Sequence, residues 1–117
     1  MPIFHHRLGA QLSNSERIFR PISEGGTSSA FENVIAAGAV VPWHLHTHEE
    51  VIVCLEGRAE CTFENGTPEE YAAGSVLVIP PLTRHTLRAL EPVRQLSFFS
   101  GAEPGTIWDT GAGDVTS

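Results

Sequence analysis

The feature that most limits the fold of this chain is a series of short, β-prone runs separated by turn residues. No window of a dozen residues keeps the i, i+3, i+4 apolar pattern of a helix that packs on a core. The runs predict strands at residues 17–21, 30–40, 50–55, 59–64, 69–72, 76–79, 86–90 and 93–99. Short strands at this spacing in one small domain favour an all-β fold, either a sandwich or a closed jelly-roll barrel.

Two glycine dipeptides predict tight turns between these runs. Asn65-Gly66 is a strong turn signal, and Gly57-Arg58 fits a two-residue hairpin turn. A hairpin at Gly57-Arg58 would pair residue 56 with 59 and 54 with 61, so that Cys54 and Cys61 face each other on adjacent strands. We expect two small, reduced, buried thiols there. A redox pair or a thiol near a metal is the alternative interpretation.

The length of 117 residues predicts a single domain, residues 1–117, with a barrel core at about 17–100 and a C-terminal arm at 101–117. The arm is rich in glycine, and we expect much of it to be irregular. Ile107 and Trp108 interrupt it, and a tryptophan in such a tail is expected to pack on its own barrel or on a second subunit. His5 and His6 are expected to be polar residues near the other end.

The charge and the hydropathy of the chain exclude some partners. The net charge is −7, and all seven basic residues are arginine. An acidic surface without lysine argues against nucleic acid or an anionic membrane as a partner. No apolar run is long enough to cross a bilayer, and the N-terminus lacks a basic stretch followed by an apolar block. We therefore expect a cytoplasmic protein.

The donors of a metal site gather in two stretches. His44, His46 and Glu50 share the parity that puts side chains on one face of a strand, with a short turn before Glu50. His85 comes later, after a turn at Pro80-Pro81. Three imidazoles and one carboxylate would hold a first-row transition metal and leave one or two positions open. His48 shares this parity but falls in the expected turn, where it is a spare ligand, a partner of a ligand or a solvated residue.

These stretches resemble the paired motifs of the cupin superfamily, in particular its small single-domain, RmlC-like bacterial members. Their first motif is glycine, five residues, His-x-His, three or four residues, glutamate, six residues and glycine, and this chain fills its fixed positions with Gly38, His44, His46, Glu50 and Gly57. Gly74, Pro80 and His85 fit the second motif, whereas Leu82 replaces its usual glycine and Ala89 its usual asparagine.

The resemblance implies a small antiparallel jelly-roll β-barrel and a homodimer. It also implies that His44, His46, Glu50 and His85 hold one divalent transition metal ion, either iron, manganese, nickel, copper or zinc. We expect a metal-dependent enzyme of the dioxygenase, isomerase or lyase type acting on a small polar organic molecule. Glu50 would be a labile ligand and catalytic proton acceptor. The alternatives are a non-catalytic small-molecule binding or sensor protein and a bare barrel with an adventitious ion.

Four residues near the motifs are candidates to line the pocket of this site. Trp43 precedes His44 and Arg84 precedes His85, so both are expected to point away from the ligands in regular strands. Of the neighbouring Phe98 and Phe99, one is expected to face the barrel interior. No serine or cysteine stands with a histidine in a nucleophile arrangement, which argues against covalent hydrolysis.

Overall fold

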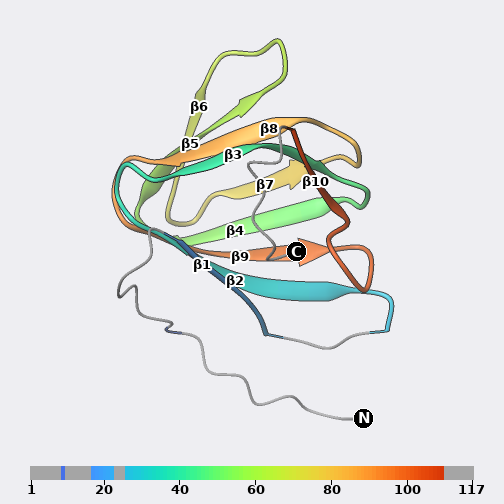
Figure 1. Ribbon diagram of the computed structural model, residues 1–117. Coiled ribbons are helices and arrows are strands. Elements are labelled where there is room, and N and C mark those ends of the chain that lie inside the picture. Colours follow the sequence, from blue (N-terminus) through green and yellow to red (C-terminus); the bar gives the residue numbers. More distant parts are fainter. Residues whose placement is uncertain (1–8, 10–16, 23–25, 110–117) are drawn as a thin grey trace.

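The computed structural model describes Gly9, residues 17–22 and residues 26–109 (Figure 1). These residues form strands and no helix, as predicted. The strands are β1 (Arg17–Pro21), β2 (Ser29–Ile35), β3 (Val40–His46), β4 (Glu50–Glu56), β5 (Arg58–Phe63), β6 (Glu69–Ala72), β7 (Val76–Ile79), β8 (His85–Ala89), β9 (Val93–Phe99) and β10 (Thr106–Trp108). The described part of the chain therefore contains no helix that is long and apolar enough to cross a membrane.

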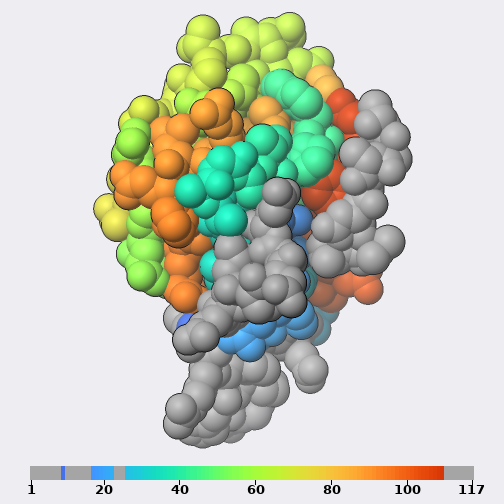
Figure 2. Space-filling view, turned by 60° about the vertical axis from the view of Figure 1, so that its left-hand side comes forward, coloured from blue at the N-terminus to red at the C-terminus, as the bar shows by residue number. Residues whose placement is uncertain are grey.

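Two antiparallel five-stranded sheets face each other and enclose the core. The first has the order β1-β2-β9-β4-β7 and the second the order β10-β3-β8-β5-β6 (Figure 1). Figure 2 shows the outside of the second sheet, where turquoise atoms of β3 lie between orange atoms of later strands and red atoms of the C-terminal strand. This architecture confirms the predicted small jelly-roll barrel.

Strand alternation fills the space between the sheets. Along β4, Glu50, Ile52 and Cys54 are buried, and the residues between them are more exposed. Ile52 and Cys54 join an apolar cluster with Val41 and Leu87 from the second sheet. Burial of such side chains stabilises the fold by roughly 1.5–3 kcal/mol each. The same alternation carries the carboxylate of Glu50 into the interior at the end of the strand.

The predicted hairpin at Gly57-Arg58 is wrong. Strand β4 pairs with β7 and β9, and β5 pairs with β6 and β8, so the chain passes from one sheet to the other at Gly57. Cys54 therefore lies opposite Gln95, and Cys61 lies opposite Leu87. Both cysteines are buried free thiols. Burial raises the pKa of Cys61 to about 12, which keeps it protonated at neutral pH.

The predicted strand at residues 30–40 is two strands. Strand β2 ends at Ile35, and the chain turns before β3 begins at Val40. The turn contains Gly38 at φ 82°, and the amide of Ala39 donates to the carbonyl oxygen of Ala36 at 3.0 Å. The turn could not be recognised from the sequence, since residues 34–41 are apolar and only Gly38 interrupts them.

The turn at Asn65-Gly66 is confirmed. Asn65 has φ 65°, a left-handed conformation that asparagine tolerates better than most residues, and the amide of Gly66 donates to the carbonyl oxygen of Phe63 at 2.9 Å. The tail contributes β10, which pairs with β3. Trp108 therefore packs on its own barrel, the first of the two predicted arrangements.

Leu82 adopts a backbone conformation that favours glycine. Its φ is 61°, its side chain is 65% exposed, and its amide donates to the carbonyl oxygen of His46 at 2.8 Å. This is the position where the cupin motif has glycine. We expect Leu82→Gly to raise the free energy of unfolding by about 0.5–1 kcal/mol. Glycine removes the left-handed cost of roughly 1–2 kcal/mol, but it loses more conformational entropy on folding than leucine does, and this offsets part of the gain.

Urea unfolding of the wild type, Leu82→Gly and Leu82→Ala measures this effect. Leu82→Ala shortens the side chain but keeps the left-handed cost, so it is the matched control. A lower stability for Leu82→Gly than for Leu82→Ala would contradict the expectation.

Candidate metal centre

Three histidines come together where the end of β3 lies beside the start of β8. His44 and His46 end β3, His85 begins β8, and His44 lies directly opposite His85 in the antiparallel register. One ring nitrogen from each histidine lies within 4.8 Å of the others. The side chains are buried, with exposed fractions of 4%, 6% and 0% for residues 44, 46 and 85. The structure thus brings together all three histidines that the motifs selected.

A β-bulge turns the histidines of β3 toward the interior. Val41 is buried in the core, so strict alternation would place residues 43 and 45 inside and His44 and His46 outside. The register of β3 against β8 shifts between Val41 and His44, where Pro42 stands. The extra residue of the bulge reverses the parity, and both histidines then face the barrel interior.

Glu50 faces the histidines from the first sheet. Its Oε1 lies 3.4 Å from Nε2 of His46 and 3.6 Å from Nε2 of His85. The carboxylate is buried, and Oε1 has no hydrogen-bond partner among the described residues. Glu50 therefore lies beside the histidine group, and its role as a fourth ligand stays a prediction.

Each histidine is held through its other ring nitrogen. Nδ1 of His44 lies 2.6 Å from the carbonyl oxygen of Pro42, and Nδ1 of His85 lies 2.8 Å from that of Thr83. A carbonyl can only accept, so these two Nδ1 atoms carry the proton. Nδ1 of His46 lies 2.8 Å from the hydroxyl of Thr106 on β10. In neutral rings, the Nε2 lone pairs of His44 and His85 then remain for another partner.

The donor set fits a divalent transition metal. Oε1 of Glu50 and Nε2 of His85 are both buried and lack a hydrogen-bond partner in the part of the chain that the structure describes, which is costly for polar atoms unless something else binds them. Neutral imidazoles and a carboxylate suit zinc, iron, copper, nickel and manganese, so the ligands alone do not select one ion. The three histidines could hold a metal ion.

Burial and mutual proximity keep the site in the charge state that metals bind. Burial and the neighbouring His85 lower the pKa of His44 to about 3. Burial alone would raise the pKa of Glu50, but the neighbouring His46 and His85 outweigh it and hold that pKa below its usual range. At neutral pH, His44 is therefore neutral and Glu50 is ionised.

The metal-free protein is expected to lose stability as the pH falls from about 6.5 toward 3. In that window the unfolded chain protonates His44 and the folded chain does not, so added protons favour unfolding. Each unit of difference between the two pKa values corresponds to about 1.4 kcal/mol. Urea unfolding of chelator-treated protein at pH 7 and pH 5 measures the loss, and His44→Gln should reduce it. An equal loss of unfolding free energy between pH 7 and pH 5 in the wild type and His44→Gln would contradict this account.

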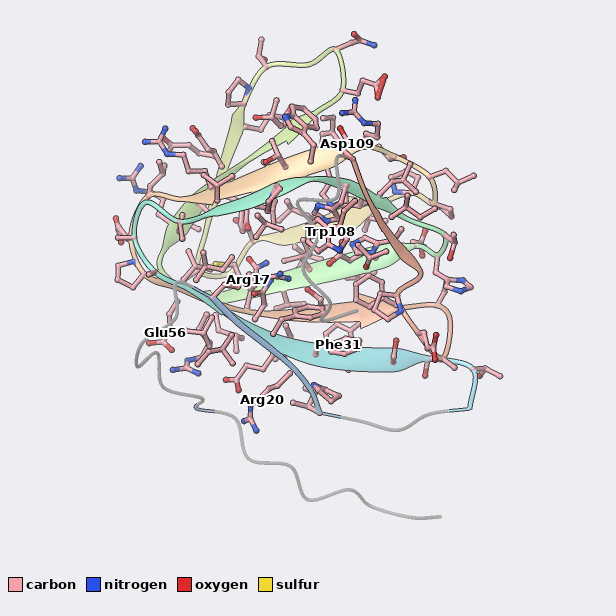
Figure 3. All side chains as sticks on the ribbon, in the orientation of Figure 1. Arg17, Arg20, Phe31, Glu56, Trp108 and Asp109 are labelled. Atoms are coloured by element: carbon pink, nitrogen blue, oxygen red, sulfur yellow. The ribbon has the colours of Figure 1, made fainter. Side chains whose placement is uncertain are left out.

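A narrow pocket opens beside the four donors. Its volume, including the part that is open to solvent, is about 330 Å³, and the pocket lies between the two sheets. Arg17, Phe19 and Asn33 line it from β1 and β2, and Thr106 and Trp108 line it from β10. Figure 3 shows Arg17 and Trp108 directed toward the barrel interior. The sequence pattern missed Arg17, Asn33 and Thr106, because none of them lies near a motif.

The other residues singled out in the sequence lie around the site. Phe99 is buried, with its ring 4.7 Å from that of His46, whereas Phe98 is exposed, so one of the two faces inward as predicted.

The guanidinium of Arg84 stacks on Trp43 at 5.0 Å and pairs with Asp109 and Glu64. His48 is half-buried against Gly101 and does not belong to the histidine group. His5 and His6 lie outside the described residues.

Comparison with known proteins connects this geometry to a family. The family model of the cupin domain matches residues 31–99. No curated protein matches the chain. Among solved structures, an uncharacterized conserved protein with a double-stranded beta-helix domain from Klebsiella pneumoniae is similar at 22% identity and a TM-score of 0.77, over 85% of this chain and 84% of that chain.

Two enzymes have the same fold at low identity. DMSP lyase DddQ from Ruegeria pomeroyi is 23% identical with a TM-score of 0.76, over 97% of this chain and 62% of that chain. A mutant of salicylate 1,2-dioxygenase from Pseudoaminobacter salicylatoxidans, in complex with gentisate, is 15% identical with a TM-score of 0.68, over 73% of this chain and 25% of that chain. The likeness to these structures shows the fold alone.

Proposed function

The chain belongs to the cupin family, and on that basis we propose that it is a metal-dependent enzyme acting on a small polar organic molecule. The observation that carries the proposal is the convergence of four buried donors in which Glu50 Oε1 and His85 Nε2 lack a partner. His44, His46, His85 and Glu50 would hold one divalent transition metal. Fold neighbours include a lyase and a dioxygenase, and the proposal extends to a reaction of the dioxygenase, lyase or isomerase type.

The metal, when bound, would supply a Lewis acid that polarises an oxygen of the substrate or a site for dioxygen. The protein residues supply positioning and proton transfer. The three histidines are each fixed at Nδ1, so their Nε2 atoms need little reorganisation. Glu50 is ionised and faces the same centre, and as a labile ligand it would accept a proton from a bound substrate. Phe99 beside His46 and Trp108 beside His44 would limit the access of water.

The pocket lining favours a polar ligand that carries an oxygen anion. Arg17 brings a positive charge to the pocket and is positioned by a hydrogen bond from Nε to Oδ1 of Asn33 at 3.1 Å and by stacking on Phe19 at 4.6 Å. The indole N–H of Trp108 is buried and has no hydrogen-bond acceptor among residues 17–22 and 26–109. A carboxylate or enolate oxygen would suit both groups.

Metal analysis followed by a substrate screen tests the proposal. Purified protein should contain close to one metal ion per chain after supplementation, as measured by elemental analysis. Metal-loaded protein is then offered diketones, thiols, catechols and hydroxy acids, with oxygen uptake and NMR as readouts. Turnover that disappears in Glu50→Gln, while metal content is retained, would support the enzyme. Protein that carries no metal after supplementation would refute the proposal.

A non-catalytic binding or sensor protein is the second candidate function. The narrowness of the pocket supports it, because a narrow pocket beside the metal donors would retain a small ligand. Metal-loaded protein that binds members of the panel in calorimetry but converts none of them would select this function over the enzyme.

We further propose that two copies of the chain form a homodimer. Strand β7 is an edge strand of the first sheet, and Val76 and Val78 on it are 61% and 56% exposed. Exposed apolar side chains on an unpaired edge favour contact with another chain. Light scattering on the full chain and on Val76→Lys tests this arrangement. The expected cytoplasmic location and the expected lack of nucleic-acid or membrane partners stay predictions.

A further inference from the structure

Strand β10 lies outside the matched cupin domain, yet it covers the histidines of β3. The family match ends at residue 99, and β10 spans Thr106–Trp108. In its antiparallel register, Thr106 lies opposite His46 and Trp108 lies opposite His44. Ile107 between them points outward and is 54% exposed. Each inward residue of β10 therefore meets one histidine of the site.

The two contacts differ in chemistry. Trp108 packs its ring on His44, with centroids 4.8 Å apart. Thr106 places its hydroxyl 2.8 Å from Nδ1 of His46. His44 and His85 use carbonyl groups two residues before them for the same purpose, so their orientation is set by the backbone that directly precedes them. His46 alone among the three depends on a side chain from another strand.

Both ends of β10 are fixed to the barrel. At its start, Gly105 accepts a hydrogen bond from the amide of Thr47 at 3.1 Å and packs so closely that an added Cβ would lie 1.9 Å from Thr47 Oγ1. At its end, the amide of Asp109 donates to the carbonyl oxygen of Trp43, and the carboxylate of Asp109 pairs with Arg84. The hydroxyl of Thr106 is thus held in place between two anchors.

We propose that Thr106 is a positioning residue of the metal centre. Its hydroxyl accepts the Nδ1 proton of His46, which fixes the ring orientation and directs the Nε2 lone pair toward the centre that Glu50 and His85 face. The inference rests on the proposed function, because it assigns a role at the same metal site. It gives the segment beyond the cupin domain an indirect part in metal binding, through the orientation of His46.

Cobalt(II) affinity measured by competition with a chromophoric chelator tests the role of Thr106. Thr106→Val keeps the shape of the side chain and removes the hydroxyl, and it should weaken cobalt binding by about 10–100-fold. Thr106→Ser restores a hydroxyl and should bind cobalt nearly as tightly as the wild type. Thr86→Val is the matched control, since the Thr86 hydroxyl donates to the carbonyl oxygen of Val41 and not to a histidine; it should leave cobalt affinity close to wild type.

A second readout follows the histidine itself. In zinc-loaded protein, the Nδ1 proton of His46 should give a slowly exchanging NMR signal in the wild type and Thr106→Ser, and this signal should be lost in Thr106→Val. Thr106→Val that binds cobalt as tightly as the wild type would overturn the inference and leave the proposed function standing. Wild-type protein that fails to bind cobalt would overturn both.

Discussion

Replacing His85 with alanine is expected to abolish stoichiometric metal binding while the barrel remains folded. His85 is fully buried, and its Nε2 is one of the two donor atoms without a partner. Four-ligand sites in proteins bind zinc with roughly 10–16 kcal/mol, so the loss of one imidazole should cost about 4 kcal/mol, or about a thousandfold in the dissociation constant. Elemental analysis of the purified variant measures the metal, and circular dichroism reports the fold.

The matched control for His85→Ala is His48→Ala. His48 has the same parity in the first motif but lies half-buried against Gly101, outside the histidine group. It should retain metal at the wild-type level, whereas His44→Ala should behave like His85→Ala. Full metal occupancy in His85→Ala, or loss of metal in His48→Ala, would contradict the assignment of the ligands.

The fold class and the donor residues could be predicted because they depend on local patterns. Short β-prone runs predict strands wherever their alternation is regular, as along β4, where Glu50, Ile52 and Cys54 all face inward. The spacing of His44, His46 and Glu50 is likewise a local property. The prediction that His44 and His46 share a face needed only their separation of two residues.

Which face the histidines occupy could not be predicted from the sequence. It depends on the bulge between Val41 and His44, and a bulge is defined by the pairing of β3 with β8, which lies more than 40 residues away in the chain. The role of Thr106 could not be predicted either, because it depends on the pairing of β10 with the distant strand β3. A threonine in a polar, glycine-rich tail gives no signal, and the neighbouring Trp108 gives only the expectation of a packed segment.

Gly57 shows how a plausible local turn signal can predict the wrong topology. A glycine followed by arginine between two strand runs is typical of a hairpin, and the left-handed φ of 85° at Gly57 agrees with a tight turn. Yet the chain crosses between the sheets there, because β9 and β7 occupy both sides of β4. The glycine is needed for a tertiary contact that no hairpin would have, its close approach to Pro92.

Gly57→Ala is therefore expected to lower the free energy of unfolding by about 2–5 kcal/mol. Two costs add at this position. A left-handed L-residue costs roughly 1–2 kcal/mol. The added Cβ would also lie 2.0 Å from the carbonyl oxygen of Pro92, so the backbone of the β8–β9 connection must shift, which costs about 1–3 kcal/mol in a packed region.

Gly38→Ala separates the two costs. Gly38 has nearly the same φ, 82°, but an added Cβ there would meet no atom within 4 Å. Its loss of stability should be limited to the left-handed cost, and urea unfolding of the two variants at pH 7 gives the difference directly. A clearly larger loss for Gly57→Ala would place the constraint in the contact with Pro92. Equal losses would mean that the crossing between the sheets tolerates a side chain, and that Gly57 serves only the local turn that the sequence pattern indicated.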